Sequence, residues 1–106
     1  MPKSKIRKAI SLLTQAANPS KIILFGSQAR GDASKDSDID LLVIKDSLKD
    51  KSEETLRLSR ILWDSKIYAD VLVTTRDEFD YWKGTAGHIY CEIELEGRVL
   101  YDKEAS

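Results

Sequence analysis

Residues 25–44, FGSQARGDASKDSDIDLLVI, decide what fold this chain can adopt, because they join two apolar runs through an acidic loop. The run IILF at 22–25 precedes them, and they end in the run LLVI at 41–44. Short unbroken apolar runs between turn residues indicate strands that are buried on both faces. Asp36, Asp38 and Asp40 stand at the entrance to the second run. We therefore expect two core strands, with three mutually repelling carboxylates where the second begins.

Patterns outward from this stretch predict the remaining elements. Residues 3–17 carry an apolar stripe at helical spacing, and Asn18-Pro19 ends that helix. Residues 27–31 could form one helical turn. Asp50, followed three residues later by Glu53, is typical of a helix start, so we expect a helix to about residue 65. Its inner face would be Leu58, Ile61 and Leu62.

The last third continues the alternation of strands and helices. Residues 67–74, IYADVLVT, predict a third strand. A short helix around Phe79, a break at Gly84 and Gly87, a helical segment at 89–95 and a final strand at 98–101 follow. The predicted fold class is α/β (α+β), with helices packed on one small sheet. At 106 residues the chain has room for one domain, residues 1–106.

Composition narrows the functional classes. The chain is 42% apolar and 33% charged with a net charge of −1, which is too balanced for general nucleic-acid or membrane-surface binding. No stretch resembles a signal peptide or a membrane span, so the cytoplasm is the expected location. Cys91 is expected to be a buried apolar residue, and His88 is not expected to bind metal.

Asp38 and Asp40 are two residues apart on a predicted strand, so their side chains point to the same face with Cα atoms about 6.6 Å apart. Like charges on one face repel unless a cation lies between them, and carboxylates suit Mg²⁺ or Mn²⁺. Asp70, inside the apolar third strand, would supply a third ligand. The alternatives are a polar turn at Asp38 and Asp40, and for Asp70 an exposed edge position or an ion pair with Lys66 or Arg76.

Gly26 and Ser27 lie where the first strand turns into the possible helix start. Such a position offers backbone N–H groups to an anion, and a phosphate is the natural ligand. Gly26 permits close approach, Ser27 adds a hydroxyl donor, and Arg30 could contact a phosphate or pair with an acid. Arg30 is more often structural, and the Walker-type phosphate loop pattern is absent.

The combination Gly26-Ser27-x-Ala29-Arg30-Gly31 with Ser37-Asp38-Ile39-Asp40-Leu41 resembles the minimal nucleotidyltransferases (MNT) of the DNA polymerase beta superfamily. The ending at 96–101, EGRVLY, is also similar to that branch. The resemblance implies a palm-like fold with a mixed sheet. It further implies that Asp38, Asp40 and Asp70 bind two Mg²⁺ ions and act in catalysis, while Gly26 and Ser27 hold the triphosphate of ATP.

The same resemblance implies transfer of AMP to a hydroxyl acceptor. In the minimal branch this points to an antitoxin that modifies a tyrosine of a HEPN-type ribonuclease toxin and forms a hetero-oligomer with it. Two other hypotheses stay open: an enzyme that modifies a small hydroxylated molecule such as an aminoglycoside, and a partner-binding module without turnover. The aromatic residues Phe79, Tyr81, Trp82 and Tyr90 could form a partner surface, although burial in the core is the favoured interpretation.

Overall fold

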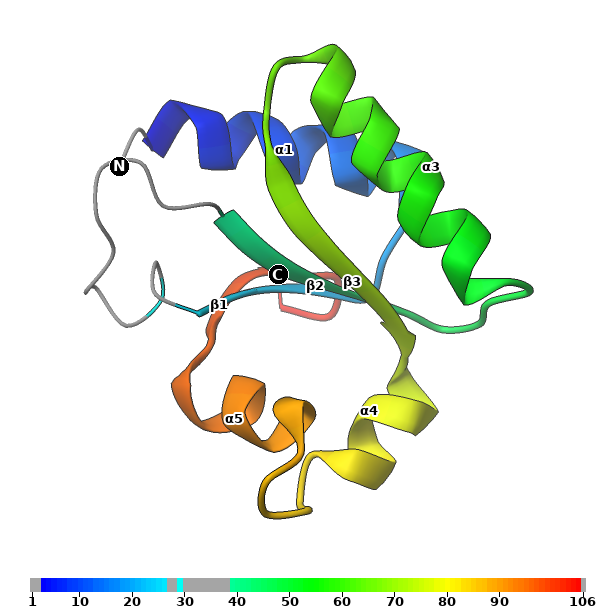
Figure 1. Cartoon of the computed structure of the whole chain (residues 1–106), viewed down its shortest axis with the longest axis vertical. Helices are drawn as coiled ribbons and strands as arrows, with labels where there is room; N and C mark the ends of the chain where they lie inside the picture. Colours follow the sequence, from blue (N-terminus) through cyan, green and yellow to red (C-terminus); the bar gives the residue numbers. More distant parts are fainter. Residues whose placement is uncertain (1–2, 27–28, 30–38, 106) are drawn as a thin grey trace.

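The computed structural model describes residues 3–26, 29 and 39–105. In this part of the chain helices pack on both sides of one sheet (Figure 1). The elements in chain order are α1 (Lys3–Ala17), β1 (Lys21–Phe25), β2 (Ile39–Lys45), α3 (Lys51–Asp64), β3 (Ala69–Thr75), α4 (Arg76–Trp82), α5 (Ile89–Glu96) and β4 (Arg98–Asp102). The predicted α/β architecture is confirmed, and each of these elements was expected from the sequence.

The four strands form one mixed sheet in the order β3-β2-β1-β4. β1 runs antiparallel to both of its neighbours, whereas β2 and β3 are parallel and are joined through α3. β1 and β2 occupy the centre, which explains their unbroken apolar sequences, because a central strand covered on both faces has no solvent side. β3 is an edge strand.

The larger core lies between the sheet and the helices α1 and α3 (Figure 1). Leu13 of α1, Leu58 and Leu62 of α3, and Leu41 and Val43 of β2 are fully buried there. Ile61, expected on the inner face of α3, packs against this core but is only half-buried. Alternate residues of β2 point to the opposite face.

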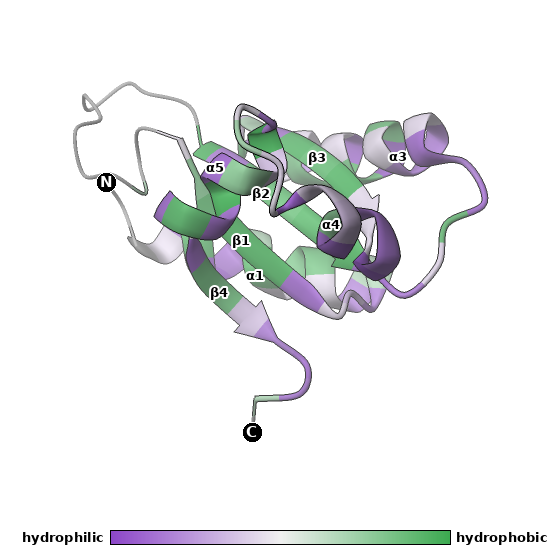
Figure 2. Cartoon of the chain, turned by 90° about the horizontal axis from the view of Figure 1, so that it is seen from below, coloured by the Kyte–Doolittle hydropathy of each residue, from purple (hydrophilic) through white to green (hydrophobic). Residues whose placement is uncertain are grey.

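A smaller core covers the other face of the sheet, where α4 and α5 pack (Figure 2). Phe79 of α4 and Tyr90 of α5 are buried against Leu42 and Ile44, with ring centroids 5.5 Å apart. These two helices are short and cover only part of that face.

The aromatic cluster expected in the core divides into two pairs. Phe79 and Tyr90 are buried as expected, but Tyr81 is 74% exposed and Trp82 is 37% exposed. Tyr81 is two positions after Phe79 and so lies on the opposite side of α4, whereas Trp82 is three positions after it, near the same side of the helix, and stacks on His88. Cys91 was expected to be buried but is half-buried. It directly follows the buried Tyr90 on α5, so its side chain points to a different side of that helix.

Helix α3 has a defined cap at each end. Asp50 accepts a hydrogen bond from the backbone N–H of Glu53 at 3.0 Å, as the sequence pattern predicted. At the other end Lys66 takes a left-handed conformation with φ of 60°, and its backbone N–H donates to the carbonyl of Trp63. The N–H of Ile67 returns to the carbonyl of Leu62 at 2.9 Å, which completes a Schellman motif. This motif fixes how the chain enters β3.

Among the described helices, none is both long and apolar enough to cross a membrane.

Candidate active site

Asp40 and Asp70 are direct register partners on the parallel strands β2 and β3. Neighbouring strands lie about 4.8 Å apart, so the two Cα atoms are close enough for the carboxylates to share one ligand. Both residues alternate with side chains of the larger core, which places them on the face that carries α4 and α5. The sequence could place Asp70 on the next strand along the chain, but only the strand pairing places it beside Asp40.

The position of Asp70 differs from what its apolar surroundings suggested. Its side chain is exposed, because β3 is an edge strand and neither α4 nor α5 reaches its first residues. Within the described part of the chain Asp70 forms no hydrogen bond or ion pair, and Arg76 pairs with Asp46 and Glu104 instead. Of the alternatives for Asp70, the exposed edge position is observed, and no ion pair with Lys66 or Arg76 forms among the described residues. An accessible carboxylate of this kind can receive a ligand without first losing a partner.

Gly26 ends β1 next to Asp40, whose register partner on β1 is Phe25. The backbone of Gly26 has a φ of 75°, a region that residues with a Cβ rarely adopt. A Cβ built on Gly26 would also overlap Oδ2 of Asp40. Both the conformation and the contact therefore require glycine, and the bare backbone of Gly26 lies directly against the carboxylate.

These residues fit a hard divalent cation. Carboxylate oxygens are the ligands that Mg²⁺ and Mn²⁺ prefer, and Asp40 and Asp70 supply them from paired positions on neighbouring strands. Among the described residues no group of three His, Cys, Asp or Glu side chains is close enough to bind a metal. The predicted site residues Ser27, Arg30 and Asp38 lie outside the described residues, as does most of the helical turn expected at 27–31.

Two cavities border this arrangement. One of about 180 Å³ adjoins Gly26 and is lined by Phe25 and residues of α5, including Ile89 and Glu92. The other, of about 340 Å³, adjoins Asp70 and is lined by Trp63, Tyr68 and Ala69. The sequence pattern drew no attention to Trp63 and Tyr68 as a pair. Their proximity depends on the turn between α3 and β3, which no periodicity reveals.

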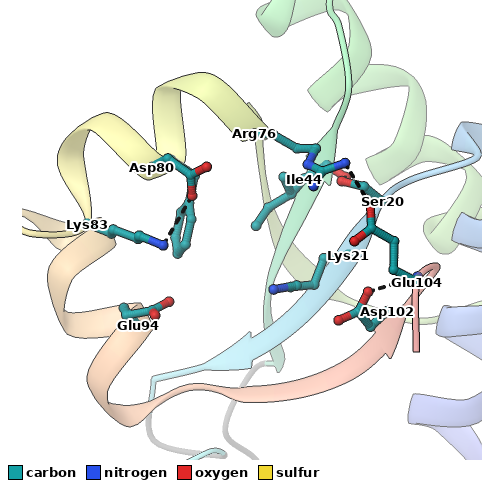
Figure 3. Close-up of a pocket in the computed structure, with 10 residues that line it drawn as sticks. Ser20, Lys21, Ile44, Arg76, Asp80, Lys83, Glu94, Asp102 and Glu104 are labelled. Atoms are coloured by element: carbon teal, nitrogen blue, oxygen red, sulfur yellow. Dashed lines mark hydrogen bonds and ion pairs between the residues drawn. The ribbon is translucent and has the colours of Figure 1, made fainter.

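A third cavity, of about 130 Å³, lies among α4, α5 and the C-terminal segment, at the other end of β1 and β2 (Figure 3). Several of its charged side chains form ion pairs: Arg76 with Glu104 at 3.1 Å and Lys83 with Asp80 at 3.2 Å. Ser20 at its wall donates to the carbonyl of Ile44. These internal pairs indicate a structural role for the charges around this cavity.

Comparison with known proteins agrees with this geometry. The sequence profile of the family described as "Polymerase beta, Nucleotidyltransferase" matches residues 7–106. The chain belongs to the polymerase beta nucleotidyltransferase family. A relative from Methanocaldococcus jannaschii, whose name describes it as a protein adenylyltransferase, is 35% identical over 81 residues, which is 76% of this chain and 77% of the relative.

Two solved structures show the same nucleotidyltransferase fold. One is a toxin-antitoxin complex with AMP-PNP, with a TM-score of 0.64 and 24% identity over 98% of this chain and 76% of that one. The other contains the MNT antitoxin bound to the tri-AMPylated HEPN toxin of Shewanella oneidensis, with a TM-score of 0.62 and 22% identity over 96% of this chain and 73% of that one. At such identity these similarities establish the fold.

Proposed function

We propose that this nucleotidyltransferase moves AMP from ATP to a tyrosine hydroxyl of a cognate HEPN-type toxin and thereby acts as an antitoxin. The observation that supports the proposal most strongly is the juxtaposition of Asp40 with Asp70 in strand register, with the bare backbone of Gly26 against Asp40. Phosphate transfer needs an anion-binding backbone next to carboxylates, and Gly26 with the two acids would supply both at this end of the sheet.

The nucleotide would lie with its triphosphate at Gly26. The absence of a Cβ on Gly26 leaves room for the Asp40 carboxylate beside the backbone, and Ser27 and Arg30 would offer a hydroxyl and a guanidinium donor to the phosphates. The three acids Asp38, Asp40 and Asp70 would hold two Mg²⁺ ions. When bound, such ions neutralise the phosphate charge and stabilise the attacking and leaving oxygens of an in-line displacement. The exposed carboxylate of Asp70 would orient the acceptor hydroxyl and accept its proton.

Two findings support a protein acceptor. The relative that shares 35% identity is described as a protein adenylyltransferase, and the similar folds occur in complexes of a toxin with its antitoxin. The cognate partner of this chain would then be a HEPN-type protein. Its tyrosine hydroxyl would attack the α-phosphorus of ATP, and pyrophosphate would leave.

The test is a transfer assay with ATP labelled at the α-phosphate, Mg²⁺ and the HEPN-type protein from the same genome. We expect label on that protein and a loss of rate of about 10²- to 10⁴-fold in Asp70→Asn, as for removal of a general base. Asp77→Asn is the matched control, because it removes one exposed carboxylate from α4 and should leave the rate unchanged. Removing Mg²⁺ with a chelator should stop transfer in the parent chain.

Transfer that survives Asp40→Asn at the parent rate would contradict the proposed chemistry. A second measurement separates catalysis from binding, since an Asp38→Ala, Asp40→Ala double variant that still neutralises the toxin fully would show that binding alone is sufficient. An aminoglycoside included as an alternative acceptor should receive no label. Label on the small molecule and none on the protein would contradict the assignment of a protein acceptor.

A further inference from the structure

Trp63 and Tyr68 form an aromatic pocket of about 340 Å³ with Ala69 and Asp70, which we call the aromatic pocket below. Trp63 is 54% exposed at the end of α3, and Tyr68 is 65% exposed just before β3. In the part of the chain that the structure describes, neither ring contacts another aromatic ring or forms a hydrogen bond. Two large accessible rings without partners thus flank one accessible carboxylate.

Other exposed aromatic residues of the protein are paired with one another. Tyr81 meets Trp82 edge to face with ring centroids 4.9 Å apart, and Trp82 stacks on His88 at 4.8 Å. The aromatic pocket is different because its two rings lie on either side of a defined turn. The Schellman motif fixes the backbone of Trp63 through its carbonyl, and Ile67, which precedes Tyr68, is buried in the larger core. The backbone on both sides of the turn is therefore held by the fold.

We infer that the aromatic pocket binds the phenol ring of the acceptor tyrosine and presents its hydroxyl to Asp70. This inference rests on the proposed function. The order across the sheet end is Gly26 just after β1, Asp40 on β2, Asp70 on β3 and then the aromatic pocket beyond the edge. In an in-line displacement the attacking and leaving groups lie on opposite sides of the phosphorus. A triphosphate at Gly26 therefore requires the acceptor on the side of the aromatic pocket.

The chemistry of the lining selects a phenol. An aromatic ring would gain binding free energy from burial against Trp63 and Tyr68 and from offset or edge-to-face contacts with their rings. A serine side chain has too little apolar surface to use these walls. In the reaction the phenol oxygen forms a bond to the α-phosphorus, and the bond from that phosphorus to the bridging oxygen of pyrophosphate breaks. The phenol proton passes to Asp70, and pyrophosphate leaves.

The test uses N-acetyl-tyrosinamide at millimolar concentration as the acceptor, with N-acetyl-serinamide as the comparison. We expect AMP transfer to the first compound only, and inhibition by N-acetyl-phenylalaninamide that is competitive with it, because that compound fills the aromatic pocket without a hydroxyl. Trp63→Ala and Tyr68→Ala should each raise the KM for N-acetyl-tyrosinamide about tenfold, with kcat changed less than twofold. Trp63→Phe should restore most of the affinity.

Two further readouts separate the acceptor side from the nucleotide side. The affinity for Mg²⁺-ATP, measured by calorimetry, should be unchanged in Trp63→Ala and Tyr68→Ala. Tyr81→Ala is the matched control, since it removes an equally exposed ring from α4 and should leave the KM unchanged. In a Trp82→Phe background Trp63 is the only tryptophan, so its fluorescence should respond to N-acetyl-phenylalaninamide.

An unchanged KM in both alanine variants would overturn the inference while leaving the proposed function intact. Equal losses in ATP affinity and acceptor transfer would also overturn it, because the aromatic pocket would then serve the nucleotide. Transfer to N-acetyl-serinamide as fast as to N-acetyl-tyrosinamide would overturn the selection of a phenol. A parent chain that binds Mg²⁺-ATP but modifies neither these compounds nor the HEPN-type protein would contradict the proposed function itself, and the inference with it.

Discussion

Gly26 shows how one residue without a side chain can shape an active site. Its φ of 75° turns the chain away from β1, and the space where a Cβ would stand is filled by the carboxylate of Asp40. The sequence identified Gly26 as a position for close phosphate approach. It could not show that the nearest neighbour is Asp40, because that contact depends on the antiparallel pairing of β1 with β2.

The glycines of the chain offer a matched series that separates these effects. In Gly26→Ala the new Cβ would sit on a left-handed backbone and would overlap Asp40. Gly87 also has a left-handed backbone, with a φ of 87°, but a Cβ there would meet only open space. A Cβ on Gly84 would meet open space too, and that backbone is not left-handed. We expect Gly87→Ala to lower the free energy of unfolding by about 1–2 kcal/mol and Gly84→Ala to change it little. Chemical denaturation measures both values.

Gly26→Ala should cost more stability than Gly87→Ala, and it alone of the three should abolish AMP transfer. If Gly26→Ala and Gly87→Ala lost equal stability, the contact with Asp40 would have no energetic consequence. If Gly26→Ala kept full transfer activity, the proposed approach of the triphosphate to this backbone would be wrong.

At the scale of elements, the sequence predicted the helices and strands but not how the strands are arranged in the sheet. Apolar periodicity and turn residues indicated every described helix and strand, and the Asp50 cap was correct. Periodicity could not give the strand order, so the pairing of Asp40 with Asp70 and the exposure of Asp70 had to come from the structure. The roles of Ser27, Arg30 and Asp38 remain predictions from the sequence.

The turn from α3 to β3 is the element that positions both Asp70 and the aromatic pocket. Lys66 adopts a φ of 60° there, although its Cβ disfavours that region. Lys66→Gly should therefore raise the free energy of unfolding by about 0.5–1 kcal/mol. Glycine removes the steric strain of the left-handed backbone, but part of that gain is lost because glycine has more conformational entropy in the unfolded chain. Urea denaturation monitored by circular dichroism measures the change.

Lys66→Ala provides the control for that variant. It removes the charge and the long side chain but keeps the Cβ, so its stability should remain close to that of the parent. A gain in Lys66→Ala as large as that in Lys66→Gly would assign the effect to the lysine side chain and contradict the backbone explanation.

In the whole molecule, the two proposed catalytic acids lie at one end of the sheet, where β2 and β3 begin. α1 and α3 pack on one face, while the shorter helices α4 and α5 pack on the other (Figures 1 and 2). An ion-pair network ties the covered side together. Glu54 of α3 contacts Lys45 of β2 at 2.6 Å and Arg57 at 2.7 Å, and Arg57 also donates to the carbonyl of Ala16 in α1. Three elements are thus joined through one largely buried carboxylate.

This network predicts how stability depends on pH. Hydrogen bonds from Arg57 and then Lys45 lower the pKa of Glu54 from 4.5 to about 2. A lowered pKa in the folded state means that the stabilisation is fully present above about pH 4.5 and is lost as the pH falls through about 2. Glu54→Gln should lower the free energy of unfolding at pH 7 by about 1–2 kcal/mol.

The pH profile of that variant distinguishes this cause from a general loss of packing. The parent should lose stability between about pH 5 and pH 2 more steeply than Glu54→Gln, so the two curves should converge at low pH. Glu53→Gln, which alters an exposed carboxylate one position away, is the control and should follow the parent. Parallel curves for the parent and Glu54→Gln over that range would contradict the assignment.

The central claim is that Asp40 and Asp70 act as one site, and a double-mutant cycle on the AMP transfer rate tests it most directly. Initial rates are measured with the HEPN-type protein and Mg²⁺-ATP for the parent, Asp40→Asn, Asp70→Asn and the double variant. Residues that act as a unit are strongly non-additive. We predict that each single variant loses most of the activity and that the double variant is no slower than the slower single variant. Multiplicative losses, or a single variant that retains the parent rate, would contradict the account.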